Sequence, residues 1–304
     1  MALKSHLRSL VLPVAIALAF AFHSFFGQLY FLTPYLVFLM LFMNYTALDI
    51  HQMRPKWMDF WLMLFQVGVA IVCYLLGRLL FSNDALADGL LVTVLTPVAA
   101  SSVVIACALG AKRETVTTFT ILDNLMISLA APLIFAFIGQ QDPSRIFTNM
   151  WIIFRRICPQ IVFPFILALL LQRFSPKVNA GISRYKGWTF YIWGFTLTIT
   201  LAKTFHNIIV SPDKQWGLMG VMLALCAVQC AILFWVGKRI GGHYGDRIAG
   251  GQELGQKNTA FGVWMATEFL NPLAALPMAF YSICQNLFNS WQMFQREKET
   301  QGRK

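Results

Sequence analysis

Asp123, Glu253 and Lys257 are ionisable side chains inside otherwise apolar stretches of the sequence. An ionised group inside a bilayer costs roughly 2.5 to 3.5 kcal/mol on insertion scales, so such residues usually mark ion, proton or substrate sites. Glu253 precedes Lys257 by four residues, which predicts an ion pair if the backbone between them is helical. The alternative is a buried pair that only permits insertion, but it leaves the surrounding polar side chains unexplained: Gln252, Gln256, Asn258 and Thr259.

Asp123 lies in a stretch rich in hydroxyl side chains, with Thr120 one turn before it and Thr117 a turn earlier. Residues three or four apart share one face of a helix, so these groups can converge on one site. Hydroxyls in membrane helices also hydrogen-bond neighbouring helices without any ligand. The cluster therefore predicts either a cation or proton site, or a polar packing contact.

Pro97 interrupts the apolar stretch 86–109 and is followed by small residues, among them Ser101 and Ser102. A proline within a helix removes a backbone hydrogen bond and kinks or breaks the helix. The freed helix ends can face ions or polar substrates. A purely structural kink is the alternative interpretation.

The composition indicates that these residues lie in a membrane protein. Of 304 residues, 58% are hydrophobic and 12% charged, with a mean hydropathy of +0.62, whereas soluble domains carry about 25% charge. This excludes a solvated globular enzyme. At about 20 residues per crossing, the chain is long enough for roughly ten transmembrane helices.

Hydropathy predicts nine apolar spans, at 10–26, 29–48, 58–80, 86–109, 115–138, 157–171, 188–201, 218–236 and 272–291. Between the last two, a polar, glycine-rich run and a short apolar stretch predict a broken tenth helix. With ten crossings, most basic residues fall on one side, which by the positive-inside rule places both termini in the cytoplasm. We therefore expect a multi-pass protein of the cytoplasmic (inner) membrane.

The two halves of the chain have similar patterns, with Gln66 and Gln229 at matching places in an apolar span. Five spans followed by five more give an inverted repeat, as in many secondary transporters. We expect a first five-helix repeat at 1–140, an outer connection at 141–156, a second, inverted repeat at 157–292 and a cytoplasmic tail at 293–304.

The segments TPVAASSVVIACALG and TTFTILDNLMISLAAPLIF resemble the fourth and fifth helices of the bile acid:sodium symporter family. ELGQKNTAFGVWMA and NPLAALPMAFYSICQNLFNS resemble its ninth and tenth helices. The most specific part is the run Glu253, Gly255, Asn258, Thr259, together with Gln66 in the third span.

The resemblance implies an all-α integral membrane protein of ten helices in two inverted five-helix repeats. A panel and a core bundle are expected, with discontinuous fourth and ninth helices that cross. The resemblance implies a first sodium site at Ser102, Glu253 and the hydroxyls from Thr117 to Thr120, and a second at Gln66 and Glu253. The residues at the helix breaks are candidates for substrate binding: Pro97, Ser101, Asn258 and Thr259.

Val103 and Lys257 depart from the family pattern, which has Asn and Gln at these places. An ammonium group at residue 257 occupies the charge position of a sodium ion and repels another cation nearby. We therefore expect Lys257 to pair with Glu253 as a built-in cation, with any coupling carried by protons through Asp123 or this pair. Apart from a sodium ion near Glu253, no metal or cofactor is expected.

The sequence thus predicts a secondary active transporter of a small organic anion, working by alternating access in a lipid bilayer, with no nucleic-acid or protein partner. An uncoupled facilitator, a channel or a sensor on the same fold are the alternatives. An integral-membrane enzyme is disfavoured, because HExxH, GxSxG and GxGxxG motifs are missing from any suitable setting and the cysteines lack CxxC spacing.

Overall fold

The computed structural model describes residues 14–48, 53–99, 102–138, 146–210, 216–270 and 272–301. In these ranges the chain is almost entirely helical and contains no strand, only an isolated bridge between Val98 and Lys257. Five of the described helices are long and apolar enough to cross a membrane: His23–Tyr45, Trp57–Phe81, Arg113–Ile138, Phe147–Phe174 and Gly217–His243. The protein is thus an all-α membrane protein.

The described helices of the first half are α2 (His23–Gln28), α3 (Thr33–Tyr45), α4 (Trp57–Phe81), α5 (Asp84–Leu95), α6 (Ser102–Leu109) and α7 (Arg113–Ile138). Those of the second half are α8 (Ile146–Phe174), α9 (Pro176–Arg184), α10 (Thr189–Val210), α11 (Trp216–His243), α12 (Arg247–Gly255), α13 (Thr259–Phe269) and α14 (Ala275–Gln301). Short 3-10 helices at Leu29–Leu32, Lys186–Trp188 and Pro272–Ala274 join some of them.

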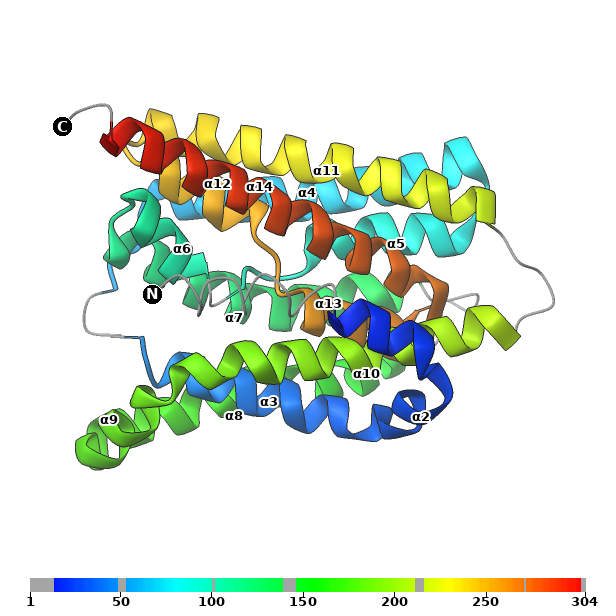
Figure 1. Cartoon of the computed structure of the whole chain (residues 1–304), viewed down its shortest axis with the longest axis horizontal. Coiled ribbons are helices and arrows are strands. Elements are labelled where there is room, and N and C mark those ends of the chain that lie inside the picture. Colours follow the sequence, from blue (N-terminus) through cyan, green and yellow to red (C-terminus); the bar gives the residue numbers. More distant parts are fainter. Residues whose placement is uncertain are drawn as a thin grey trace.

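The helices form two layers with a narrow group between them (Figure 1). One layer contains α2, α3, α8, α9 and α10, in which α10 packs on α2 and α3, and α3 packs on α8. The opposite layer contains α4, α5, α11, α12 and α14, in which α4 packs on α5, and α11 packs on α12 and α14. Between the layers lie α6, α7 and α13. The helices that follow the two helix breaks, α6 and α13, therefore occupy the middle of the molecule.

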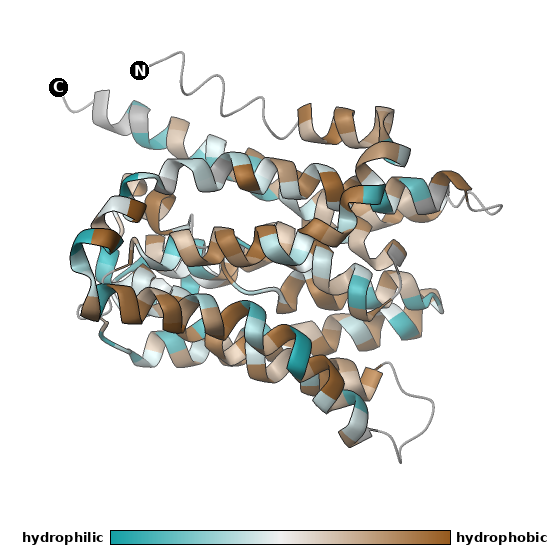
Figure 2. Cartoon of the chain, turned by 90° about the horizontal axis from the view of Figure 1, so that it is seen from below, coloured by the Kyte–Doolittle hydropathy of each residue, from teal (hydrophilic) through white to brown (hydrophobic). Residues whose placement is uncertain are grey.

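Large apolar side chains also cover the outside of the bundle. On α4, for example, Trp57 is 71% exposed and Leu79 is 77% exposed. Figure 2 shows that hydrophobic residues run along the lengths of the helices. An exposed apolar surface of this extent is stable against lipid tails but not against water.

Two helices are broken, one at Thr96 before Pro97 and one at Gln256. Thr96 turns extended, with ψ 133°, directly before Pro97, because a proline disfavours helical backbone in the preceding residue. Gln256 ends α12 in the extended conformation, with φ −93° and ψ 121°. Asn258 then caps α13, accepting a hydrogen bond from Phe261 N at 3.4 Å.

Two helices are longer than expected from hydropathy. α8 begins at Ile146, so residues 146–156, expected in an outer connection, extend a span that was predicted to start at 157. Their apolar residues continue the helical pattern, and Arg156 is neutralised by an ion pair with Glu268 of α13. α14 continues to Gln301, so most of the expected tail at 293–304 is helical. The division into two repeats stays a prediction.

α12 lies so close to α11 that only glycine fits at their contact. A Cβ atom on Gly250 would stand 2.7 Å from Gly241 Cα and 2.9 Å from Gly241 N. Real Cβ atoms essentially never approach backbone so closely. The glycine-rich run that suggested a broken helix therefore also sets the position of Glu253, which α12 carries.

We predict that Gly250→Ala destabilises the fold by about 1–3 kcal/mol, because the added methyl group overpacks the contact between α11 and α12. Gly220→Ala on α11 is the matched control, since a Cβ there meets nothing within 4 Å. Thermal unfolding midpoints of both variants in detergent provide the test. Equal midpoints would contradict the close packing described.

Candidate functional site

The two helix breaks lie side by side in the middle of the molecule and run antiparallel. Val98 and Lys257 form the isolated bridge between them. Asn258 N donates to Pro97 O at 2.8 Å, and Ala99 N donates to Gln256 O at 3.4 Å. Water does not reach the bilayer core, so backbone groups at a helix break need partners within the protein. Each break supplies some of these partners to the other.

Polar side chains on α4 and α7 complete the hydrogen bonds of the first break. Asp123 Oδ2 accepts from Val98 N at 2.6 Å, and Asn124 Nδ2 donates to Val98 O at 3.3 Å. Gln66 Nε2 lies within hydrogen-bonding distance of two carbonyl oxygens, Leu95 O at 3.2 Å and Thr96 O at 3.3 Å. Gln66 and Asp123 thus position the break as well as being candidates for binding.

Side chains on α14 hold the second break, and the sequence analysis did not identify them. Gln285 Oε1 accepts from Lys257 N at 2.8 Å, and its Nε2 donates to Lys257 O at 3.2 Å. Tyr281 OH donates to Gly255 O at 2.7 Å. A buried amide inside an apolar span was the available signal for Gln285, as it had been for Gln66.

The ionisable residues at the site are completely buried: Asp123, Glu253 and Lys257 each have 0% exposure. The expected ion pair between Glu253 and Lys257 is not formed, because α12 ends at Gly255 and the extended Gln256 breaks the helical register. Lys257 Nζ has no hydrogen-bond partner, and its electrostatic partner is Asp123. The acid that acts on Lys257 is therefore Asp123 of α7 and not Glu253 of α12.

The charges that act on Glu253 are mostly carboxylates, with Lys56 as the one base among them. Neither of its oxygens has a hydrogen-bond partner, and its strongest charged neighbour is Asp59 at the start of α4. Asp59 is itself buried, with Oδ2 accepting from Lys56 N at 2.7 Å and Oδ1 unpartnered. Asp59 was not predicted from the sequence either. It closely follows the polar connection before the span, so it looks like part of that connection.

The remaining predicted residues are distributed around the crossing. Ser102 begins α6, is fully buried and has an unpartnered Oγ. Thr120 Oγ1 donates to Val116 O at 2.7 Å, and Thr117 is buried on the same helix, α7. Asn258 lies in the crossing itself and Thr259 directly after it, whereas Ser101 lies outside the described residues.

Unpartnered oxygen atoms dominate the site. They are Asp59 Oδ1, Gln66 Oε1, Ser102 Oγ, Asp123 Oδ1, Asn124 Oδ1 and both oxygens of Glu253. A buried polar atom without a partner costs about 1–3 kcal/mol, so this set is suited to protons, water or a monovalent cation. In the described ranges, no group of three or more His, Cys, Asp or Glu residues could hold a metal ion.

The site borders the layer of α2, α3, α8, α9 and α10 through α13. Trp193 Nε1 on α10 donates to Thr259 Oγ1 at 3.3 Å, and the Thr259 and Ser282 hydroxyls lie 3.4 Å apart. The ion pair between Arg156 of α8 and Glu268 is a second polar contact of α13 with that layer. The sequence analysis did not identify Trp193, because an indole in an apolar span is usually a packing or interface residue.

Crossed broken helices with buried charges define the class of protein as a membrane transporter. The chain belongs to the SBF-like CPA transporter family, which matches residues 9–294. This confirms the resemblance to bile acid:sodium symporters that the sequence motifs indicate. No curated protein is significantly similar to the chain in sequence.

We predict that Gln285→Leu destabilises the protein, because it leaves the N–H and the carbonyl of Lys257 unpaired at about 1–3 kcal/mol each. Gln292→Leu is the control on the same helix, since Gln292 is buried and its Nε2 has no partner. The thermal unfolding midpoint should fall much further for the first variant. A similar fall for both would show that Gln285 does not support the crossing.

Proposed function

We propose that the protein is a secondary active transporter that moves a small organic anion across the cytoplasmic membrane by alternating access. The observation that carries this proposal is the antiparallel crossing at Val98 and Lys257, with Asp123 and Lys257 fully buried beside it. Such crossings expose helix ends and charged groups near mid-membrane, where a substrate can be bound from either side. Family membership supports transport as the activity.

The order of the helices supports two inverted five-helix repeats. The helical residues from 14 to 28 and then α3 are followed by α4, the broken pair α5/α6, and α7. In the second half, α8 and α10 are followed by α11, the broken pair α12/α13, and α14. We propose that α2, α3, α8 and α10 form the panel and the other long helices form the core, giving ten crossings.

The distribution of charge supports a cytoplasmic location of both termini. The C-terminal ends of α3, α8, α11 and α14 lie at the same end of the molecule as the N-terminal ends of α4, α7, α10 and α12 (Figure 1). We call this the basic end, because most basic residues near helix ends belong there: Arg54, Lys56, Lys112, Arg113, Arg173, Lys177, Arg184, Lys238, Arg239, Arg247 and Arg296. The positive-inside rule assigns such an end to the cytoplasm.

The anion would bind where α6 and α13 begin. Helix N-termini carry partial positive charge, so a carboxylate or sulfonate is favoured there. We propose that Pro97, Ser101, Asn258 and Thr259 contact it. Movement of the panel along the core would break the Trp193–Thr259 hydrogen bond and the Arg156–Glu268 ion pair. The site would then open where α13 now contacts the panel.

Glu253 is the proposed site of the coupling cation. The charge nearest in effect to Lys257 is that of Asp123, whereas Glu253 is influenced by three acids and one base, Lys56, and neither of its oxygens has a hydrogen-bond partner. A buried carboxylate without a hydrogen-bond partner is stabilised by binding a proton. A sodium ion bound by both Glu253 and Ser102 would stabilise it as well. The proton is the favoured cation, because Val103 removes the amide that the family pattern supplies for sodium.

An uncoupled facilitator, a channel or a sensor on this fold is the competing function, whereas an integral-membrane enzyme is opposed by the transporter family. Counterflow separates a carrier from a channel, since only a carrier exchanges labelled for unlabelled substrate across the membrane. Proteoliposomes loaded with a panel of small carboxylates and sulfonates provide the assay.

We predict that wild-type proteoliposomes take up a carboxylate or sulfonate together with protons, without need of sodium. A pH-sensitive dye trapped inside them reports the proton movement. Glu253→Gln should abolish proton-driven accumulation but retain counterflow, because the neutral amide keeps the shape without binding a proton. Asp84→Asn, an exposed change near one end of α5, is the control.

Lys257→Gln restores the family residue and should introduce sodium dependence in the same assay. A Lys257→Gln protein that transports without gaining sodium dependence would contradict the assignment of Lys257 as a built-in cation. Accumulation unchanged in Glu253→Gln would contradict the assignment of Glu253.

A further inference from the structure

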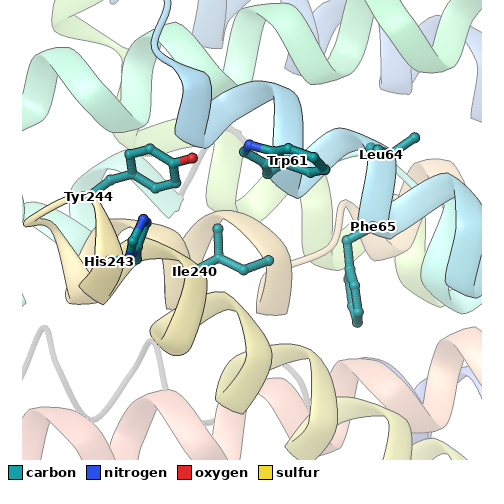
Figure 3. A pocket seen from close by; sticks show the side chains of 6 residues that line it. All are labelled: Trp61, Leu64, Phe65, Ile240, His243 and Tyr244. Atoms are coloured by element: carbon teal, nitrogen blue, oxygen red, sulfur yellow. The ribbon is translucent and has the colours of Figure 1, made fainter.

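A groove separates the start of α4 from the end of α11 on the outside of the core layer (Figure 3). It has a volume of about 490 Å³ and is lined by Trp61, Leu64, Phe65, Ile240, His243 and Tyr244. This volume lies within the usual range of small-molecule sites, about 300 to 1,000 Å³. The transport proposal does not use the residues that line the groove.

The two ends of the groove differ in chemistry. In Figure 3, the Tyr244 hydroxyl and the Trp61 indole nitrogen point toward each other at one end, with His243 beside them, while Leu64 and Phe65 lie at the other. α4 begins at Trp57 and α11 ends at His243, so the polar end coincides with the ends of two membrane-spanning helices. Trp and Tyr are favoured at that depth, where headgroups meet lipid tails.

Basic residues surround the polar end. Arg239 lies one turn before His243 on α11, exposed and stacked on Trp235 at 5.1 Å. Lys56 precedes α4, with its Nζ donating to Thr115 Oγ1 at 2.7 Å, and Arg247 begins α12; both residues are exposed. Two acids belong to the same segments, the buried Asp59 and Asp246, whose Oδ1 accepts from Ala249 N at 3.1 Å, so the three basic residues outnumber them. An anionic group is therefore favoured at the rim.

We propose that this groove binds one anionic phospholipid of the surrounding bilayer. An acyl chain lies along Leu64, Phe65 and Ile240, and the phosphate contacts His243, Tyr244 and Arg239. A water-soluble anion would leave the apolar length unfilled, and a neutral lipid would leave the basic rim unused. The lipid bridges α4 and α11, the helices on either side of the groove, and stabilises the basic end of the core.

Native mass spectrometry of the purified full chain tests this binding. The protein is mixed with equal amounts of phosphatidylglycerol and phosphatidylcholine that carry the same acyl chains. We expect one phosphatidylglycerol to be retained in preference to phosphatidylcholine. Arg239→Gln should weaken its retention by about fivefold, the effect of one basic residue near an anionic lipid surface.

Ile240→Trp fills the groove with a larger apolar side chain and should abolish the retained lipid. Ile232→Trp, at a 45% exposed position on the same helix, is the control and should retain it. Leu64→Trp is a second groove variant in case Ile240→Trp does not fold.

Equal retention of both lipids, or wild-type retention in the groove variants, would overturn the proposal. A second protein chain in place of the lipid would overturn it too. Lipid retention is measured without transport, so failure of this proposal would not contradict the proposed transport function.

Discussion

Backbone hydrogen bonding in lipid is the constraint on which the structure depends. A helix that stops inside a membrane exposes N–H and carbonyl groups that water cannot reach, and each unpaired group costs free energy. Here the breaks after α5 and α12 satisfy each other through two hydrogen bonds, Asn258 N to Pro97 O and Ala99 N to Gln256 O. The amides and acids of α4, α7 and α14 complete the pairing, so the fold is arranged around one crossing.

The crossing also determines where charge is placed. Since residue 257 lies past the end of α12, the acid that acts on its ammonium is Asp123 and not the glutamate four residues earlier. Glu253 has Lys56 and three acids as its charged surroundings, on a helix held by glycine contacts against α11. The second break thus lies between an acid without a hydrogen-bond partner and the N-terminus of α13, an arrangement suited to binding a cation and an anion.

Much of this arrangement could be predicted from the sequence, because the strongest local signals coincide with the breaks. Pro97 and the run around Gly255 located them, and the polar residues in apolar stretches identified Gln66, Asp123 and Glu253. The partner of Lys257 could not be predicted, because helical spacing was assumed across a segment that is extended. Gln285 and Trp193 were missed since their roles depend on contacts between distant segments. The start of α8 was misplaced because the ion pair that neutralises Arg156 lies on α13.

The central claim is that the segment around Lys257 lies at mid-membrane depth within a crossing. Single cysteines at Asn258 and, as a control, at Tyr244 after α11 can be introduced after replacing the native cysteines. A membrane-impermeant maleimide is then applied from either side, with and without substrate. We expect Tyr244→Cys to be labelled from one side only, and Asn258→Cys to be labelled slowly, with a substrate-dependent change in the accessible side. Rapid one-sided labelling of Asn258→Cys, equal to that of Tyr244→Cys, would place the segment in an ordinary loop and contradict the account.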